Sequence, residues 1–542
     1  MTNIKHENLF SVNPVNTSLP ATQPVEKDEE HRQKLERPDY LASSISNALA
    51  YVAGEPTVAI VSDLDLLSRY EFNDYGNGRR LLDLFKGKVL YNPSSGNWLL
   101  YEEGRWRPDN KRKEGMLKKA NELYCHLSSA LQCSYSNMDF DDCEDDASEN
   151  EESAVEGKEM KREYDRMKKA ISRLGDSARQ KALLKSAEAE CSDATIGFNL
   201  HNHLLVVQNG TVDLRTGNLL SHIPEHYITM RSDIRYDSKV PEPKRFLQFL
   251  DEVFDHNVEL IHYVQRLLGY CLTGETREHV FHVLHGEGAN GKSVLINLFQ
   301  RMFSEYCRSV SSGALAHRAD GDKPNPSLLQ AKDCRTIIVN ETNGGLKLNG
   351  ALIKQISAGD EICPRTLFEE NQNFVPHMKI LWITNHIPEI DWQDGGLRRR
   401  YRLIPFPVTF GLDQQDRDLP EKLWAEREGI LRWLVEGAVA WYNHGLGELP
   451  DTMADALEKE RRNEDSVYAF FQDEIIKTDV PEDRIQAKSL HDAYLDYCAN
   501  NEIDYPVTIS AFGIKLTKLG ITKKKMPGYN VYIGLKLREF EE

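Results

Sequence analysis

The sequence predicts an α/β protein, and three features of its pattern support this fold class. A short apolar run at 281–284 leads into a glycine-rich turn, and a helical stretch at 294–303 follows it. Two further apolar runs, at 336–339 and 379–383, have the length of buried strands and end in polar residues. Stretches with helical apolar spacing, such as residues 243–275, lie between and around these runs. Strands that alternate with helices in this way predict an α/β core.

Length and composition indicate a globular protein of several domains. A chain of 542 residues predicts about two to four of them. No apolar run reaches the roughly 18 to 20 residues that span a bilayer, and the N-terminal residues lack the patterns of export and organelle signals. The 9 cysteines include no C-x-x-C pair. We therefore expect reduced thiols in a cytosolic protein, with no zinc ribbon and no membrane segment.

The net charge of −18 is unevenly distributed along the chain. Residues 139–159 form a dense acidic cluster, which we interpret as a solvated loop inserted into a folded domain, with a nucleic-acid mimic or a protein-binding segment as alternatives. Residues 507–538 contain no acid and carry only cations, namely Lys515, Lys518, Lys523, Lys524, Lys525, Lys536 and Arg538. An acidic total is therefore compatible with a local basic patch.

Residues 1–73 are predicted to be largely disordered, because the first 40 are polar and lack periodicity. Towards the end of this segment, Asp63 and Asp65 follow an apolar run. Such a pair could belong to the metal site of a polymerase or primase, but a primase domain needs a longer preceding segment. A helix N-terminus with Asp63 as its cap is the simpler interpretation.

Residues 74–240 are predicted to form a mixed α/β domain that contains the acidic insert. A hairpin at 89–108 carries Trp98 and Trp106, which we expect to pack together in a core rather than to stack on bases. Residues 241–278 have helical apolar spacing and predict a small helical collar just before the glycine-rich turn.

The glycine-rich turn GEGANGKS at 286–293 matches G-x-x-x-x-G-K-[ST], with a strand before it and a helix after it. Glycines let successive backbone N–H groups turn toward one anion, and the helix adds its positive N-terminal end. The turn therefore predicts a site for ATP and Mg²⁺, in which Lys292 reaches the phosphates and Ser293 binds the metal. The predicted contacts are Gly286, Glu287, Gly288, Ala289, Asn290, Gly291, Lys292, Ser293 and Val294. An ordinary turn between a strand and a helix is the alternative.

Polar residues after the later apolar runs complete the predicted site. Glu341 follows the run at 336–339, where a carboxylate can hold Mg²⁺ or polarise the attacking water, and a solvent-facing glutamate is the alternative. Asn385 follows the run at 379–383 and can orient that water. The arginine-rich stretch 398–402 provides the kind of cation that reaches a neighbouring subunit's γ-phosphate.

These motifs resemble those of the superfamily 3 helicases, and within them the primase-helicases of poxviruses, phages and plasmids. The stretches that are similar to the motifs A, B, B-prime and C are GEGANGKS, IIVNE at 337–341, the segment 357–379 and ITNHIPEI at 383–390. The similarity extends over about residues 80–540. Asn340 departs from the second acid that many members have, which leaves Glu341 alone in the metal role.

The resemblance implies an AAA+-like P-loop ATPase domain at 279–445 that forms a hexameric ring with one ATP site at each subunit junction. It also implies that Arg399 or Arg400 is the arginine finger. A β-hairpin between the motifs B and C would grip single-stranded DNA, with Arg365 and Lys379 near the strand. An ordinary ion pair is the alternative for Arg365.

Residues 451–542 predict a winged-helix domain, which begins after the glycine- and proline-containing stretch 444–450. Three helices, at 466–476, 487–501 and 509–520, precede a strand at 529–537. The third helix and the lysine wing form a basic surface suited to duplex DNA, through Lys515, Lys518, Lys523, Lys524 and Lys525. A solvated charged surface is the alternative.

Together these features predict an ATP-dependent DNA helicase that acts as a ring in the replication of a phage, satellite, plasmid or other mobile element. Its location would be the cytoplasm of a bacterial host, or wherever the element replicates. A separate primase or host replication proteins are the further partners expected. Two alternatives stay open: a bifunctional primase-helicase, and a regulatory ATP-binding ring that recruits or blocks replication proteins.

Overall fold

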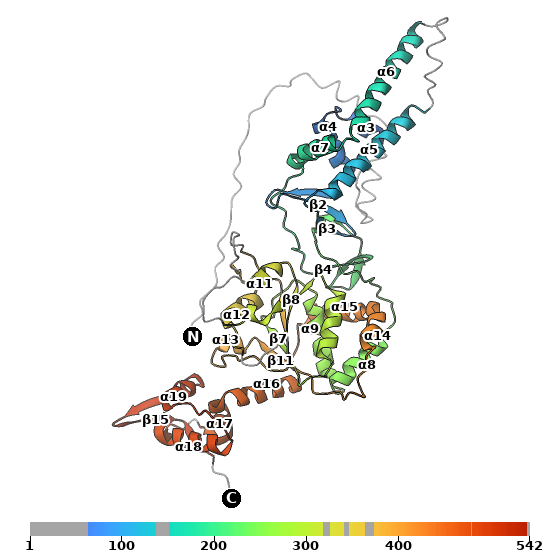
Figure 1. Ribbon diagram of the computed structural model, residues 1–542. Coiled ribbons are helices and arrows are strands. Elements are labelled where there is room, and N and C mark those ends of the chain that lie inside the picture. Colours follow the sequence, from blue (N-terminus) through green and yellow to red (C-terminus); the bar gives the residue numbers. More distant parts are fainter. Residues whose placement is uncertain are drawn as a thin grey trace, which may run out of the picture. The chain divides into compact units, whose positions relative to one another are not determined.

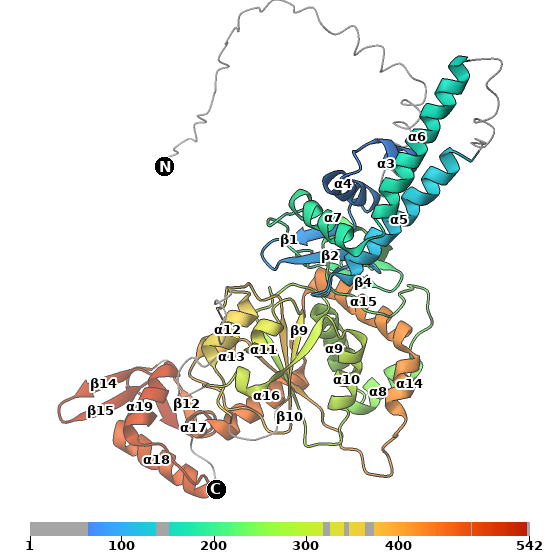
Figure 2. The same cartoon turned by 45° about the horizontal axis from the view of Figure 1, so that its top comes forward.

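The computed structural model describes residues 63–136, 151–317, 326–340, 346–363, 373–478 and 480–538 (Figures 1 and 2). The chain divides into the units 1–59 and 60–542, and every described residue belongs to the second. Most of the segment predicted as disordered, 1–73, therefore lies outside the described residues. None of the helices within these ranges is both long and apolar enough to cross a membrane.

The first described part of the chain combines helices with a small antiparallel sheet. Its strands β1 (Val89–Asn92), β2 (Asn97–Glu102) and β3 (Arg105–Pro108) pair in chain order. Its helices are α3 (Asp63–Ser68), α4 (Asp74–Leu84), α5 (Glu114–Ser134), α6 (Glu151–Arg173) and α7 (Ser177–Glu190). Apolar residues from all of these helices and from β1 and β2 meet in one core. A helix start at this place and the hairpin predicted at 89–108 are confirmed, although Asp63 is the first residue of the helix and not its cap.

The two tryptophans of this sheet do not pack on each other, so that prediction is wrong. Trp106 lies directly opposite Tyr101 and shares its face of the sheet. Trp98 is three residues before Tyr101, and side chains alternate between faces along a strand, so Trp98 points to the other face. There it packs edge-on against Tyr91 at 5.5 Å between ring centroids. Both tryptophans are buried, as the expected core role requires.

The acidic insert is shorter than the predicted loop over 139–159. Helix α6 begins at Glu151, so the end of the insert is helical, and residues 137–150 lie outside the described residues. Glutamate has a high helix propensity, and α6 packs along α5, which explains why the helix extends into the acidic sequence.

A second small antiparallel sheet follows, with β4 (Leu204–Val207), β5 (Gly210–Asp213) and β6 (Asn218–Leu220), and then the short 3₁₀ turn η1 (Pro224–His226). Buried residues of this sheet, such as Leu205 and Val212, share a core with α8 (Lys244–Val253) and α9 (Val258–Cys271). The domain predicted over 74–240 is therefore divided between two cores, and the predicted collar is part of the second of them.

A parallel five-stranded sheet forms the centre of the next part, which confirms the predicted α/β class. Its order is β11-β7-β10-β9-β8. The strands are β7 (Phe281–His285), β8 (Cys307–Ser311), β9 (Thr336–Asn340), β10 (Lys379–Thr384) and β11 (Tyr401–Pro405), and all of their pairings are parallel. The accompanying helices and turns are α10 (Lys292–Met302), η2 (Ser312–Ala314), α11 (Pro326–Gln330), α12 (Gly350–Ala358), α13 (Gly395–Arg398), α14 (Leu419–Ala425) and α15 (Arg427–His444).

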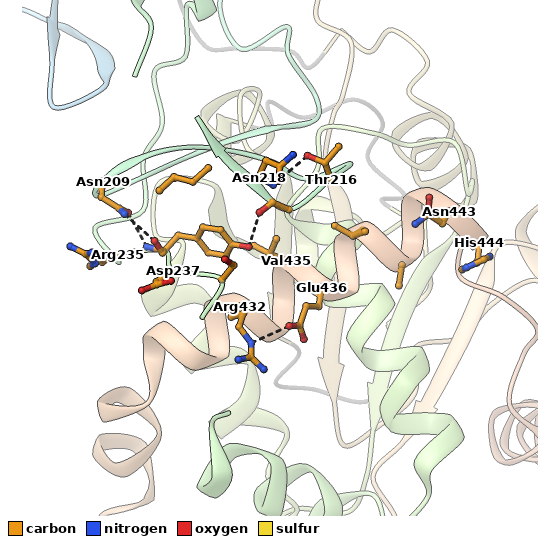
Figure 3. A pocket seen from close by; sticks show the side chains of 16 residues that line it. Asn209, Thr216, Asn218, Arg235, Asp237, Arg432, Val435, Glu436, Asn443 and His444 are labelled. Carbon is orange, nitrogen blue, oxygen red and sulfur yellow. Dashed lines mark hydrogen bonds and ion pairs between the residues drawn. The ribbon is translucent and has the colours of Figure 1, made fainter. Parts of the chain in front are cut away.

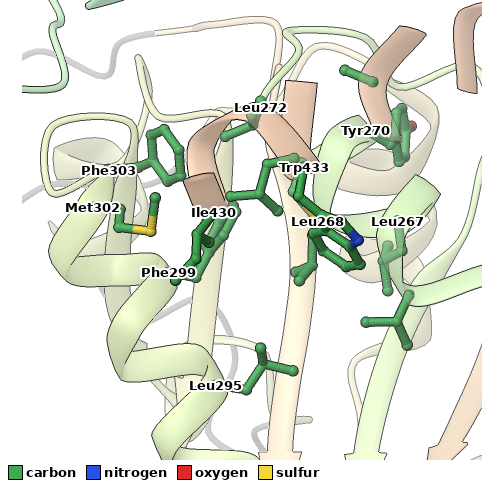
Figure 4. Close-up of a cluster of buried hydrophobic side chains, with 14 of the residues drawn as sticks. Leu267, Leu268, Tyr270, Leu272, Leu295, Phe299, Met302, Phe303, Ile430 and Trp433 are labelled. Carbon is green, nitrogen blue, oxygen red and sulfur yellow. The ribbon is translucent and has the colours of Figure 1, made fainter. Parts of the chain in front are cut away.

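The sheet is buried on both faces, and successive residues of its strands point to different cores. In β9, Ile338 joins one core, whereas Ile337 and Val339 join the other. Figure 4 shows part of the first core, where side chains of α9, α10 and α15 meet. Helices α9 and α15 approach so closely that a Cβ on Gly269 would lie 2.1 Å from the backbone nitrogen of Ala438. Leu295, Ile296 and Phe299 of α10 belong to the same core, which packs this helix against the sheet.

The C-terminal part has a core of its own, which runs from Val467 to Leu535. Its elements are α17 (Ser466–Glu474), β12 (Ile475–Lys477), β13 (Arg484–Gln486), α18 (Ala487–Asn500), α19 (Ile509–Lys518), β14 (Lys523–Met526), β15 (Tyr529–Ile533) and β16 (Leu535–Leu537). The three predicted helices are confirmed. Helix α16 (Asp451–Glu464), which the prediction placed in this domain, instead contributes Met453 to the core of the central sheet.

Candidate functional site

The loop between β7 and α10 leaves a group of backbone N–H groups unused. Gly288 and Gly291 have positive φ values of 117° and 85°, which turn the chain sharply before the helix. Within the described part of the chain, the N–H groups from Glu287 to Gly291 donate no hydrogen bond. Such a group of free donors beside a helix N-terminus attracts an anion.

Lys292 is the first residue of α10, and its side chain turns back beneath this loop. Its Nζ donates to Gly286 O at 2.6 Å, to Asn290 Oδ1 at 2.9 Å and to Asn385 Oδ1 at 3.0 Å. The residue is only 3% exposed, and burial lowers the pKa of its amine to about 8. All three acceptors are neutral, so the amine has not found the anionic partner that a buried cation favours.

The parallel pairing of β7 and β10 explains how Asn385 reaches a lysine 93 residues earlier. Thr384 lies opposite His285, so the residues that follow the two strands meet at the same end of the sheet. His285 Nε2 also lies 3.2 Å from Asn385 O. Two residues that the sequence assigned to one site, Lys292 and Asn385, are therefore in direct contact. His285 was not foreseen, since a histidine at a strand end has no distinctive spacing.

The structure describes only one of the two predicted metal ligands, Ser293 and Glu341. Ser293 is exposed in the first turn of α10, whereas Glu341 lies outside the described residues. Asn340, just before it, lies opposite Ile383 of β10. The end of β9 therefore lies at the same end of the sheet as Lys292 and Asn385. In the described ranges, no group of three or more His, Cys, Asp or Glu side chains is arranged to hold a metal ion.

The two candidate finger arginines differ in what they contact. Arg400 donates from Nε to Ser357 Oγ at 3.2 Å and from Nη1 to Gly396 O at 3.1 Å. Arg399 is exposed, and its guanidinium has no hydrogen-bond or ion-pair partner among the residues described. Of the two candidates, Arg399 is the one whose guanidinium is not held by other residues that the structure describes.

The position of these arginines also separates them from the loop of their own chain. Tyr401, which follows Arg400, lies opposite Phe281, the first residue of β7, whereas the loop follows the last residue of that strand. A five-residue strand places these ends roughly 13 Å apart. Arg399 and Lys292 therefore lie at opposite ends of the same sheet.

Lys379 does not lie on a surface, so the predicted DNA contact is wrong for it. The residue is 2% exposed, and its Nζ donates to the backbone oxygens of Thr273 and His377. Nearby, Arg335 donates to Leu272 O at 2.6 Å. Both cations satisfy carbonyls just beyond the C-terminal end of α9, where helix carbonyls lack partners and the dipole is negative. The other predicted contact of this group, Arg365, lies outside the described residues.

The basic residues of the C-terminal part are exposed with one exception. Lys518, at the end of α19, and the strand residues Lys523, Lys524 and Lys525 are solvent-exposed. Lys515 instead forms an ion pair of 2.8 Å with Asp465, which is buried. It is therefore less available for DNA than the sequence predicts.

Figure 3 shows another hollow, of about 770 Å³, between residues 209–238 and helix α15. Its polar groups largely satisfy one another, since Tyr236 donates to Gly217 O at 2.9 Å and Arg432 pairs with Glu436 at 3.0 Å. None of the residues predicted to bind nucleotide or DNA lines it.

Comparisons with known proteins confirm the resemblance that the motifs predict. Residues 78–255 match a family model described as D5 N terminal like. The chain is 25% identical over 360 residues to the putative helicase L207/L206 of Acanthamoeba polyphaga mimivirus. The aligned region covers 61% of this chain and 37% of that protein. It is 23% identical over 485 residues to the putative helicase 121R of Invertebrate iridescent virus 3, and this aligned region covers 80% of this chain and 50% of that protein.

Another relative, the putative helicase 184R of Invertebrate iridescent virus 6, is 29% identical over 266 residues, with 45% of this chain and 27% of that protein covered. The chain thus spans half or less of the length of these relatives. A solved structure, the apo C terminal region (305-718) of NrS-1, is 12% identical with a TM-score of 0.43, and the match covers 86% of this chain and 100% of that one.

Proposed function

We propose that this chain is an ATP- and Mg²⁺-dependent DNA helicase of the superfamily 3 type. The observation that carries the proposal is the contact between Lys292 and Asn385, 3.0 Å apart beside a loop with unused N–H groups. One residue comes from the glycine-rich motif and the other from the motif 93 residues later. Such a pair is what phosphoryl transfer needs: a cation for the phosphates and an amide that orients water.

The residues of the loop fit a nucleoside triphosphate. The Nδ2 atom of Asn290 is a buried donor without a partner among the described residues, and the space next to Gly288 is open. Lys292 would hold the β- and γ-phosphates, Ser293 would take one metal position and Glu341 another. Bound MgATP would supply the phosphoanhydride whose hydrolysis drives strand separation. Asn385 would orient the water that attacks it.

We further propose that the site is completed by a neighbouring subunit in a hexameric ring, with Arg399 as the finger. Arg399 has no side-chain partner among the described residues and lies at the far end of the sheet from its own loop, which supports action in trans. A contact of this kind joins different surfaces of two subunits, and such contacts give rings when they close. Arg400, held by Ser357 and Gly396, supports the position of the segment instead.

DNA would be contacted by two parts of the chain. Arg365, between the motifs B and C, would meet single-stranded DNA in the ring. The C-terminal part, with α19 and the β14–β15 hairpin, has the order of elements of a winged helix. Its exposed cations Lys518, Lys523, Lys524 and Lys525 would meet duplex phosphates, a sequence-independent attraction that weakens with salt. The setting would be replication of a viral or other mobile element, with a separate primase or host proteins as partners.

The test compares DNA-stimulated ATP hydrolysis and unwinding of a forked duplex in the wild type and in Lys292→Ala. We expect the variant to lose at least about 100-fold in hydrolysis and to unwind no DNA. Lys181→Ala, a change of the same kind at an exposed position of α7, is the matched control and should retain both activities. Full activity of Lys292→Ala would reject the proposal. Nucleotide binding without unwinding by the wild type would favour a regulatory ring.

A further inference from the structure

Asp465 lies at the joint between the central part of the chain and the C-terminal part. It follows α16, which packs against β11 of the central sheet, and it precedes α17, which belongs to the C-terminal core. The residue is 3% exposed, and its Oδ1 accepts from the backbone nitrogen of Tyr468 at 3.4 Å in the first turn of α17. The carboxylate is therefore a buried charge with a fixed place at this joint.

The two oxygens of Asp465 accept hydrogen bonds from both parts that meet there. Oδ1 lies 2.8 Å from Nζ of Lys515 on α19, in the C-terminal part. Oδ2 accepts from Nε2 of Gln393 at 3.1 Å, in the loop between β10 and α13 of the central part. A cation and a neutral amide thus share one negative charge. Loss of either donor leaves the buried carboxylate more dependent on the other.

The loop that contains Gln393 leads directly to Arg399. On one side of Gln393, Trp392 donates from Nε1 to Glu464, the last residue of α16. On the other side, Asp394 caps α13 by accepting from two backbone N–H groups of its first turn, at 2.9 and 3.1 Å. Arg399 directly follows this helix of 4 residues, whose stability depends strongly on its cap. A firmer hold on Gln393 therefore makes the position of Arg399 better defined.

We propose that Asp465 is a positioning residue through which duplex DNA on α19 acts on Arg399, an inference that rests on the function proposed above. Duplex phosphates compete with the carboxylate for Lys515. Once the lysine has turned to a phosphate, the carboxylate remains buried and charged, and its bond to Gln393 becomes stronger. The loop is then held more firmly, and Arg399 is fixed in the orientation that the neighbouring site needs.

Exposure allows this exchange at Lys515 and not at Asp465. The lysine side chain is 25% exposed, whereas that of the aspartate is 4% exposed. Lys518, three residues later on α19, is exposed and lies beside Lys515 on the helix surface. A Cβ added to Gly513 of this helix would lie 3.7 Å from Nζ of Lys523, so the lysine strand β14 lies next to α19. Phosphates attracted by these exposed cations therefore come close to Lys515, while the carboxylate stays out of their reach.

The test measures ATP hydrolysis by the full chain with and without a short blunt-ended DNA duplex, and fluorescence anisotropy of the labelled duplex gives its affinity. We expect the duplex to raise the wild-type rate at least about 5-fold. Asp465→Asn keeps the shape and can cap α17, but it removes the charge that holds Lys515 and strengthens the bond to Gln393. It should abolish the increase, and it should strengthen duplex binding about 3- to 10-fold because Lys515 is released.

Gln393→Leu tests the joint from the central part. Leucine has a similar volume but no donor, and the change leaves every residue of the C-terminal part in place. It should also abolish the increase, but it should weaken duplex binding about 2- to 5-fold, because a carboxylate with one donor fewer holds Lys515 more firmly. A loss of packing alone would not move the duplex affinity in opposite directions in the two variants. Gln393 is only partly buried, so this variant keeps the test decisive even where Asp465→Asn loses stability.

Matched changes at exposed positions are the controls. Asp496→Asn lies on α18 and Gln132→Leu on α5, and both residues face solvent. Each should keep the increase in hydrolysis and stay within about 2-fold of the wild-type duplex affinity.

A wild type that the duplex does not stimulate, an increase that persists in either variant, or duplex affinities that change in the same direction in both would overturn the inference. Failure of the proposed function has a different signature. In that case the wild type hydrolyses no ATP, or Lys292→Ala hydrolyses it as fast, and both proposals fall together.

Discussion

Two buried lysines lie at opposite ends of the central sheet, and their chemistry is similar. Lys292 follows the C-terminal end of β7, whereas Lys379 is the first residue of β10. Both are at most 3% exposed, and within the described part of the chain both donate to neutral oxygens. Burial lowers the pKa of Lys292 to about 8 and that of Lys379 to about 7. Burial, charge and pKa therefore do not separate the two sites.

The difference lies in what surrounds each amine. The acceptors of Lys379 are backbone oxygens of Thr273 and His377, which have fixed positions. Lys292 instead contacts two side-chain amides, those of Asn290 and Asn385, which can turn away. It also lies next to backbone N–H groups that donate to none of the described residues, whereas Lys379 donates to a carbonyl at the end of a helix. A buried cation thus indicates a ligand site where the donors around it are unsatisfied, and a structural role where it satisfies its neighbours.

The largest expected effect tests whether the same contrast holds for the two arginines before β11. Arg399→Ala should lower DNA-stimulated hydrolysis at least about 100-fold, because a finger stabilises charge in the transition state, while nucleotide binding stays near that of the wild type. Arg400→Ala should mainly lower the melting temperature, since it loses bonds within its own chain. A greater loss of hydrolysis in Arg400→Ala would reverse the assignment.

Mixtures of two variant subunits test the proposed action of Arg399 in trans. Subunits with Arg399→Ala keep an intact loop, and subunits with Lys292→Ala keep an intact arginine. Mixing the two inactive variants should therefore restore hydrolysis at junctions where the intact loop of one subunit meets the intact Arg399 of the other. A mixture that stays as inactive as its components would contradict a finger supplied by the neighbour.

The sequence could predict the turn between β7 and α10 because its motif fixes residue types, spacing and flanking elements together. Lys292 contacts Asn385 because the strands before them, β7 and β10, run parallel and adjacent to each other. The local sequence of either strand does not predict that they are neighbours in the sheet. The motif also predicts which residues contact a nucleotide, but it does not predict which of them are buried. That Asn290 is buried depends on the space at Gly286, where an added Cβ would lie 2.1 Å from Asn290 Nδ2, and this space is a property of the folded backbone.

The error at Lys379 has the opposite cause. A lysine before an apolar run looks like the exposed end of a strand, and nothing nearby indicates that the end of α9 lies against it. The cation is needed there because Thr273 and its neighbours have carbonyls without helical partners. The placement of α16 in the C-terminal part was wrong for the same reason. Residues far away in the sequence decide whether α16 packs on the central sheet or on the C-terminal part. The glycine and proline residues between the segments do not indicate which packing occurs.

Lys379→Met provides a smaller but sharper test of the comparison. The substitution keeps most of the apolar volume, but it leaves the carbonyls of Thr273 and His377 without a donor. We expect the free energy of unfolding to fall by about 1–3 kcal/mol, because each buried acceptor without a partner is costly, and removal of a desolvated amine offsets only part of this. Nucleotide and DNA affinities of the folded protein should be unchanged. If Lys379→Met weakened the binding of single-stranded DNA and left the stability unaltered, the predicted DNA contact of Lys379 would be supported after all.

The smallest expected effect is the pH dependence of that difference in stability. In the unfolded chain the Lys379 amine keeps its usual pKa of 10.5, whereas burial lowers its pKa to about 7 in the folded protein. Between these values the unfolded state binds a proton that the folded state has lost, so rising pH favours folding. The stability of the wild type relative to Lys379→Met should therefore increase from pH 7.5 to 9.5, with a slope of up to about 1.4 kcal/mol per pH unit. Lys181→Met, at an exposed position, serves as the control series in the same buffers. A difference that stays constant with pH would mean that the Lys379 amine keeps its proton in the folded state, and the two ends of the sheet would then hold lysines of different kinds.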